Sequence, residues 1–110
     1  MKLPSAERAI VNIAKLRDYC LNPEHPEGQH KAYVFATRLG LRVENAEELQ
    51  AVLLTIVSSH EAVFSREIEH GKLYVVDFVM TTPVGQATVR SSWIIRNGED
   101  FPRLTSCYII

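Results

Sequence analysis

The sequence is poor in the features that mark exported, membrane-spanning and metal-binding proteins. Only two cysteines occur, Cys20 and Cys107, far apart and outside any CxxC spacing. Residues 1–5 contain no apolar signal segment, and no run approaches the ~20 apolar residues that cross a bilayer. Isolated cysteines in a protein that is not exported are usually reduced. We therefore expect a cytoplasmic protein with free thiols and no membrane association.

The sequence also lacks an excess of either positive or negative charge, because the formal net charge of the 110 residues is −1. This excludes the global basic field of strong nonspecific nucleic-acid binders, but it leaves room for a local basic face. The sequence contains no GxSxG, P-loop or HExxH motif, and its four histidines have no zinc-like spacing with the cysteines. We therefore expect no metal and no cofactor, so that any catalysis has to use ordinary side chains.

The sequence does have the length of one domain, 1–110, and a helical pattern in its first half. Apolar residues recur at the helical spacing i, i+3 and i+4 over 13–20, 29–39 and 45–57. Asn12 is a suitable N-cap for the first helix, Gly40 is placed to end the second, and Asn45 opens the third with a capping-box pattern. Residues 5–11 fit either a short helix or an extended segment.

The second half changes to segments rich in β-branched and aromatic residues. Turn sequences at 70–71, 83–85 and 97–98 separate these segments, which cover 64–68, 73–81, 86–95 and 103–110. Strands joined by such short connections pair antiparallel. The predicted fold is therefore α+β, with N-terminal helices packed on one face of a four-stranded antiparallel meander.

Side chains alternate between the two faces of a strand, so the last two strands predict which residues meet the helices. The helix-facing set is Ala87, Val89, Ser91, Trp93, Ile95, Leu104, Ser106, Tyr108 and Ile110, and the open face carries Thr88, Arg90, Ser92, Arg103 and Thr105. Ser91 and Ser106 would then lie among apolar residues. They either pack in the core with hydrogen-bond partners or line a cleft whose aromatic rings stack on a base.

A first candidate site is the loop of residues 23–28 together with the start of the following helix. Free backbone N–H groups and the helix dipole favour an anion there. Gly28 would let a ligand approach the backbone, Lys31 would add a positive charge, and His25 and His30 would bring imidazoles suited to acid–base work. These groups suit a phosphate or phosphodiester. The alternative is a rigid surface loop whose histidines act as caps or lie in solvent.

A second candidate site is the open face of the sheet. Arg90 could hold a phosphate bidentately through its guanidinium, with Arg103 and Thr105 close by on the next strand. The alternative is an ordinary solvent-facing surface, which is usually polar in a half-covered sheet.

Two stretches carry a resemblance to known proteins. Leu21-Asn22-Pro23-x-His25-Pro26-x-Gly28-x-x-Lys31-Ala32 and the closing residues 89–108 resemble an uncharacterised bacterial family of about this length. Its members occur as small standalone proteins and as C-terminal domains of phage-head-related polymorphic toxins. The order of helices before four strands and the Arg-Leu-x-Ser/Thr-x-Tyr ending are also similar to the barnase–RelE superfamily of ribonuclease toxins.

The candidate residues and the appearance of the first family in toxins suggest a metal-independent endoribonuclease toxin, one half of a toxin–antitoxin-like pair, with RNA and a small cognate protein as expected partners. A histidine would deprotonate the ribose 2′-OH, and Lys31 and Arg90 would stabilise charge on the phosphate. The predicted catalytic residues are His25, Lys31 and Arg90, and the predicted substrate-binding residues are Gly28, His30, Arg103, Thr105, Ser106 and Tyr108. The alternatives are a non-catalytic binding module (an antitoxin, immunity protein or regulatory partner) and a plain homodimer.

Overall fold

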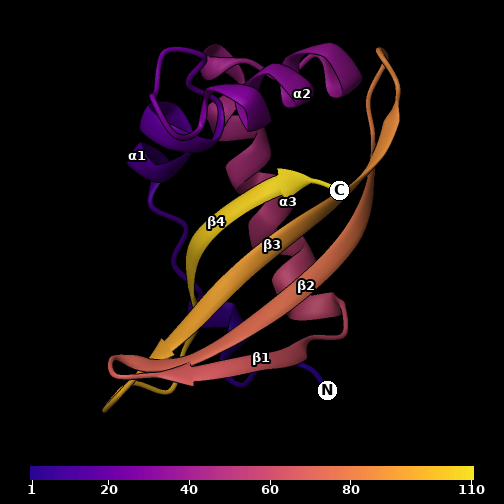
Figure 1. The fold of residues 1–110 in the computed structure, drawn as a ribbon. Coiled ribbons are helices and arrows are strands. Elements are labelled where there is room, and N and C mark those ends of the chain that lie inside the picture. The colour runs from indigo at the N-terminus through magenta and orange to yellow at the C-terminus, as the bar shows by residue number, and fades with distance from the viewer.

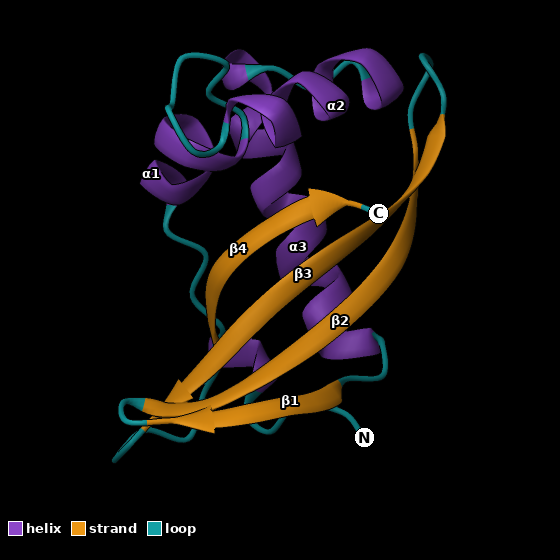
Figure 2. Ribbon diagram, in the orientation of Figure 1, coloured by secondary structure: helices purple, strands orange, loops and turns teal.

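The N-terminal half of the chain forms a helical layer over one face of a sheet that the C-terminal half builds (Figures 1 and 2). This computed structural model describes residues 1–110. Figure 1 shows α3 running behind the sheet, with α1 and α2 gathered beyond one end of it. The predicted α+β class and the helices-then-strands order are confirmed.

The helical layer consists of short turns and two longer helices. In chain order these are η1 (Ala6–Arg8), α1 (Ile13–Lys15), the wide π-helical turn η2 (Leu16–Cys20), α2 (Gln29–Leu39), η3 (Val43–Asn45) and α3 (Ala46–Ser59). None of them combines the length and the apolar character that crossing a bilayer requires. The three predicted helices are therefore present, although the first one widens halfway along.

Two of the predicted helix caps form and one does not. The Asn12 side chain accepts a hydrogen bond from the Ala14 N–H at 2.9 Å, and Gly40 ends α2 with a left-handed φ of 68°. The capping box predicted to open α3 is wrong, because Asn45 accepts instead from the Arg42 N–H, one turn earlier, at 3.0 Å. That hydrogen bond closes η3, which occupies the place of the expected helix start.

The sheet has four strands in the order β1-β2-β3-β4, all antiparallel, as predicted. Its strands are β1 (Val63–Ile68), β2 (Gly71–Thr81), β3 (Gln86–Arg96) and β4 (Arg103–Ile109). Ile10, in the segment whose conformation the sequence left open, is extended and pairs in parallel with Arg103. The N-terminal segment therefore covers the start of the β4 edge.

A β-bulge in β4 overturns part of the face assignment. Trp93 pairs with Leu104, but its neighbour Ser92 pairs with Ser106, so Thr105 is an extra residue. Cys107 is therefore buried on the covered face. The predictions that Ser106 and Tyr108 face the helices are wrong: they lie on the open face, opposite Ser92 and Arg90. Strict alternation fails here because one inserted residue shifts every later side chain to the other face.

The core lies between the covered sheet face and the helices. Its largest fully buried side chains include Trp93, Phe35, Leu49 and Leu53. Ser91, which is also fully buried, donates a hydrogen bond to the Val76 carbonyl oxygen at 2.6 Å and accepts one from Trp93 Nε1 at 2.9 Å. Its hydroxyl is thus satisfied within the core, as the packing alternative expected, and it lines no cleft.

Both cysteines are buried, unoxidised and part of this core. Cys20 belongs to η2 and Cys107 to β4, so their thiols meet where the two layers touch. Its proximity to Cys20, together with burial, raises the pKa of the Cys107 thiol well above its ordinary value. Such a thiol is a packing group rather than a nucleophile.

Candidate functional site

His25 holds the loop before α2 in place. Its Nδ1 accepts hydrogen bonds from the backbone N–H groups of Glu27 at 3.0 Å and of Gly28 at 3.1 Å. This geometry assigns the proton of the neutral ring to Nε2. The ring also packs edge-on against Tyr19, with centroids 4.7 Å apart. In this arrangement no nitrogen of His25 is free to accept a proton, and the residue fixes the start of α2.

Gly28 is buried because the loop packs closely against Tyr19 at this position. A Cβ at this position would lie 2.8 Å from the carbonyl oxygen of Tyr19, too close for any side chain. The glycine therefore lets the loop pack on η2 and leaves no opening for a ligand at its own Cα. His30, which follows in the first turn of α2, is exposed.

Lys31 reaches from α2 to the sheet. Its Nζ lies 4.3 Å from the centroid of the Tyr108 ring, a cation–π contact between the helical layer and β4. Lys31 forms no ion pair with a carboxylate. His30 is its neighbour in the chain, but successive helical residues point about 100° apart, so the two side chains diverge. Lys31 thus places an uncompensated charge beside a phenol.

Arg90 completes this cluster on the open face. Its Nε and Nη2 donate to the two carboxylate oxygens of Asp77 on β2, at 2.9 and 2.8 Å. These hydrogen bonds, and secondly the interaction with the Tyr108 hydroxyl, hold the pKa of Arg90 well above its ordinary value. Asp77 neutralises the guanidinium and fixes its orientation, so Arg90 is a rigid neighbour of Tyr108 and contributes little free charge.

We call Lys31, Arg90, Ser106 and Tyr108 the tyrosine site. Ser106 belongs to it because it shares the open face with Tyr108, two residues along β4. Four of the nine predicted site residues therefore meet at one edge of the sheet. The bulge is what brings Ser106 and Tyr108 to the face that Arg90 occupies.

Arg103 and Thr105 lie toward the other end of β4. Arg103 binds Glu99 through Nε at 3.0 Å and Nη2 at 2.8 Å, which lowers the pKa of Glu99 and raises that of Arg103. The Thr105 hydroxyl donates to the Ser92 carbonyl oxygen at 3.1 Å. Five residues separate Arg103 from Tyr108, which corresponds to about 16 Å at the rise of a strand. Arg103 therefore does not reach the tyrosine site, and Thr105, although it directly precedes Ser106, has its hydroxyl bound to the backbone.

Three residues that lie beside the predicted site residues were missed by sequence reasoning: Asp77, Lys15 and Arg96. Asp77 could have been found, because the hairpin that pairs Thr81 with Gln86 also pairs Asp77 with Arg90 when counted back along both strands. Lys15, from α1, and Arg96, from β3, line the same hollow as Thr105. No short-range pattern links residues so far apart in the chain.

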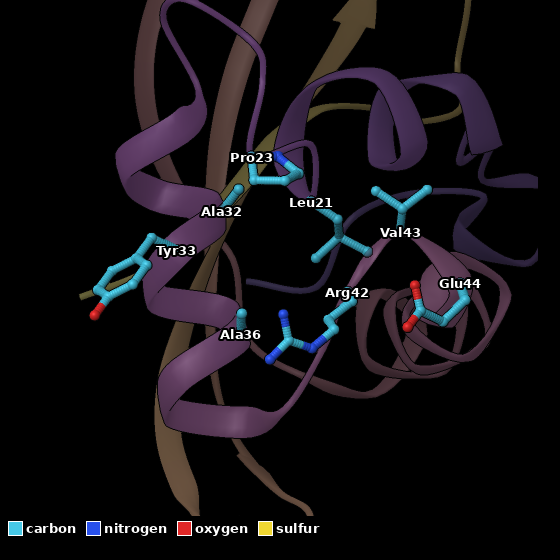
Figure 3. Close-up of a pocket in the computed structure, with 8 residues that line it drawn as sticks. All are labelled: Leu21, Pro23, Ala32, Tyr33, Ala36, Arg42, Val43 and Glu44. Carbon is cyan, nitrogen blue, oxygen red and sulfur yellow. The ribbon is translucent and has the colours of Figure 1, made fainter.

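The molecule also has an apolar hollow of about 260 Å³ between α2 and residues 41–44 (Figure 3). Its lining is Leu21, Pro23, Ala32, Tyr33, Ala36, Arg42, Val43 and Glu44. No predicted site residue lines it. No group of three or more histidine, cysteine, aspartate or glutamate side chains is arranged to hold a metal ion.

Comparison with known proteins gives a family and no characterised relative. No curated protein matches the sequence, and no solved structure matches it either. One family model does match, described as "Domain of unknown function (DUF6883)", and the match covers residues 2–110. Because this is nearly the whole chain, the protein belongs to the DUF6883 family.

Proposed function

We propose that the protein is a metal-independent endoribonuclease of the toxin type, which acts on RNA in the cytoplasm through the tyrosine site. The observation that carries the proposal is the meeting of Lys31, from the helical layer, with Tyr108 and Arg90 on the open face of the sheet. RNA carries its own nucleophile, the ribose 2′-OH. Its cleavage therefore requires only charge stabilisation at the phosphate and two proton transfers.

The contacts suggest a role for each residue. Lys31 stabilises the charge that develops on the phosphate, because its ammonium has no carboxylate partner. The Tyr108 hydroxyl donates its proton to the leaving 5′-oxygen. Arg90 is a positioning residue, held by Asp77 beside Tyr108. His25, first expected to be the base, stays outside this mechanism because its acceptor nitrogen is occupied by two backbone N–H groups.

The reaction balances without a co-reactant. The 2′-oxygen attacks phosphorus as water takes its proton, and the bond from phosphorus to the 5′-oxygen breaks. The products are a 2′,3′-cyclic phosphate and a free 5′-OH, and Tyr108 regains its proton from solvent. Lys31 remains protonated throughout and acts only through its charge.

The test is cleavage of a labelled single-stranded RNA in the presence of a chelator, with the purified protein and two variants. Lys31→Met keeps the length of the side chain and removes the charge, and we expect a loss of about 10²-fold or more in cleavage rate. Lys2→Met is the matched control, since Lys2 is exposed and forms no ion pair. We expect it to cleave at the rate of the parent.

Two outcomes would overturn this function. One is intact RNA after incubation with the parent protein. The other is a Lys31→Met variant that remains as active as the parent, which would exclude the tyrosine site as the source of cleavage. Expression in a bacterial host, with growth and total RNA followed together, gives the same comparison for toxicity. A small neutralising protein that copurifies from the native host would support the toxin–antitoxin-like pairing.

A second candidate is a non-catalytic protein-binding module, an antitoxin, immunity protein or regulatory partner. It is favoured by β1, an edge strand on which Val63 is 68% exposed and Phe64 50% exposed. Such an edge can accept a strand from a partner or from a second copy. Intact RNA together with a stable complex would favour this candidate, and light scattering would show whether the complex is a homodimer.

A further inference from the structure

The open face has a second charged feature at the end opposite the tyrosine site. Residues of α1, β3 and β4 surround a hollow of about 120 Å³, lined by Ile10, Asn12, Lys15, Ile94, Arg96, Arg103, Leu104 and Thr105. A shallower hollow shares Ile94, Arg96 and Thr105 with it and adds His70 and Asn97. We call the two together the basic hollow.

The basic hollow differs from the other hollows in its charge. No aspartate or glutamate lines it, whereas Lys15, Arg96 and Arg103 do. In each of the other two hollows that contain an arginine, a carboxylate accompanies it: Glu44 beside Arg42, and Asp77 beside Arg90. Among the hollows that contain an arginine, the basic hollow is therefore the one whose lining does not balance its cations.

Ion pairing leaves two of these cations free. Lys15 and Arg96 take part in no ion pair, while Arg103 is bound to Glu99. The carboxylate bound to Arg103 is that of Glu99, and the carboxylate of the next residue, Asp100, is engaged by Arg8. Glu99 responds to the charge of Arg96 as well as to that of Arg103, which shows that the guanidinium of Arg96 lies near this pair. One carboxylate thus lies near two of the three cations, Arg103 and Arg96.

The hollow is also rigid. Ile94, at its floor, is 8% exposed, and the parallel pairing of Ile10 with Arg103 fixes one wall. The guanidinium of Arg103 has two partners. It pairs with the Glu99 carboxylate, and its Cζ lies 5.1 Å from the centroid of the Phe101 ring. Arg103 is therefore a fixed cation in this hollow, and a fixed charge binds an anion at a lower entropic cost than a flexible surface side chain does.

We propose that the basic hollow binds a backbone phosphate of single-stranded RNA, some two or three nucleotides away from the phosphate at the tyrosine site. The inference rests on the proposed function for the identity of the polymer. A guanidinium and an ammonium are the groups that bind phosphate oxygens best. The two sites lie on the same open face, and Arg103 of the hollow is about 16 Å from Tyr108 along β4. An RNA strand that runs along β4 contacts both sites. A phosphate bound in the basic hollow therefore aligns the RNA with β4.

The test uses a probe that cannot be cleaved, a 2′-O-methyl RNA oligonucleotide of about eight residues, and follows its binding by fluorescence anisotropy at several salt concentrations. The double variant Lys15→Ala/Arg96→Ala should bind at least about 10-fold more weakly than the parent. It should also reduce the magnitude of the slope of log affinity against log salt by about 0.7, the value for one phosphate contact on a single strand. Arg38→Ala/Arg66→Ala, which removes two exposed and unpaired arginines elsewhere, should leave both quantities unchanged.

The outcomes separate this inference from the proposed function. A double variant that binds the probe as the parent does, or a parent that does not bind it, overturns the basic hollow as a phosphate site, whether or not RNA is cleaved. If the parent binds the probe, loses binding in the double variant, and yet leaves cleavable RNA intact, the hollow stands and the endoribonuclease is wrong. Matching melting temperatures of parent and variants would exclude unfolding as the cause of lost binding.

Discussion

The two faces of the sheet are built from the same strands but differ in burial and in how their polar groups are paired. On the covered face, Val89, Ser91 and Trp93 are fully buried, and the one polar group among them has both its hydrogen-bond partners. On the open face, Arg90 and Asp77 form a partly exposed ion pair, and Thr105 bulges out of register. Stability therefore resides mainly in the covered face, and the proposed chemistry uses the open one.

The open face itself divides into two ends with different charge. At the tyrosine site, Asp77 neutralises Arg90, so the free charge comes from Lys31 alone. At the basic hollow, Lys15 and Arg96 are both unpaired. An end with fixed, neutralised groups is suited to positioning a reacting phosphate, and an end with free cations is suited to holding the polymer.

The largest expected effect on stability comes from truncating a large buried side chain at the centre of the covered face. Trp93→Ala removes the largest fully buried side chain, and we expect it to lower the free energy of unfolding by about 3–5 kcal/mol. The matched substitution on the open face is Val79→Ala, at a side chain that is 62% exposed, with an expected change within about 0.5 kcal/mol. Urea unfolding of the three proteins measures both. Comparable losses at the two positions would show that something covers the open face as well.

A medium effect is expected from the polar group inside the covered face. Ser91→Ala leaves the Trp93 indole N–H without its acceptor and takes a donor from the Val76 carbonyl, so we expect a loss of about 1–3 kcal/mol. Ser92→Ala, the next residue and on the open face, should change stability by no more than about 0.5 kcal/mol. Equal effects from the two serines would mean that the Ser91 hydroxyl contributes no more than a solvent-facing one.

Local pattern was enough to predict the elements, and it was not enough to predict the site. The strands, α2 and the Gly40 stop are each encoded by residues close together in the chain. The bulge at Thr105 has no such local pattern, because it is set by how β4 pairs with β3 while Ile10 pairs along its other edge. One unforeseen residue changed the faces of Ser106 and Tyr108, and with them the composition of the candidate site.

In the loop before α2, residues that were predicted to be functional have structural roles. The residue types of His25 and Gly28 suit phosphate chemistry, but each has a structural role that sequence cannot distinguish from a functional one. His25 accepts two backbone N–H groups, and Gly28 packs against the Tyr19 carbonyl. Of the loop and the first turn of α2, only Lys31 reaches the open face. Which residue of a candidate motif is free depends on tertiary contacts.

The smallest expected effect concerns the carboxylate at the rim of the basic hollow. The hydrogen bonds from Arg103 lower the pKa of Glu99 in the folded protein below its ordinary value of about 4.3. A group with a depressed folded pKa stabilises the fold above its unfolded pKa, and this contribution is lost as the pH falls through the folded value. Glu99→Gln removes that part of the acid dependence. Since the pair is at the surface, we expect a change of about 2 °C or less in the difference between melting temperatures at neutral and acidic pH.

The same substitution sharpens the comparison between the two ends of the open face. Without Glu99, Arg103 becomes a third unpaired cation in the basic hollow, and the uncleavable oligonucleotide should bind more tightly and with a steeper salt dependence. Glu67→Gln, at an exposed residue of β1 that forms no ion pair, removes the same formal charge far from β4 and should do neither. Equal tightening by both variants would show that net charge attracts the oligonucleotide, and the arrangement of cations in the hollow would then have no part in it.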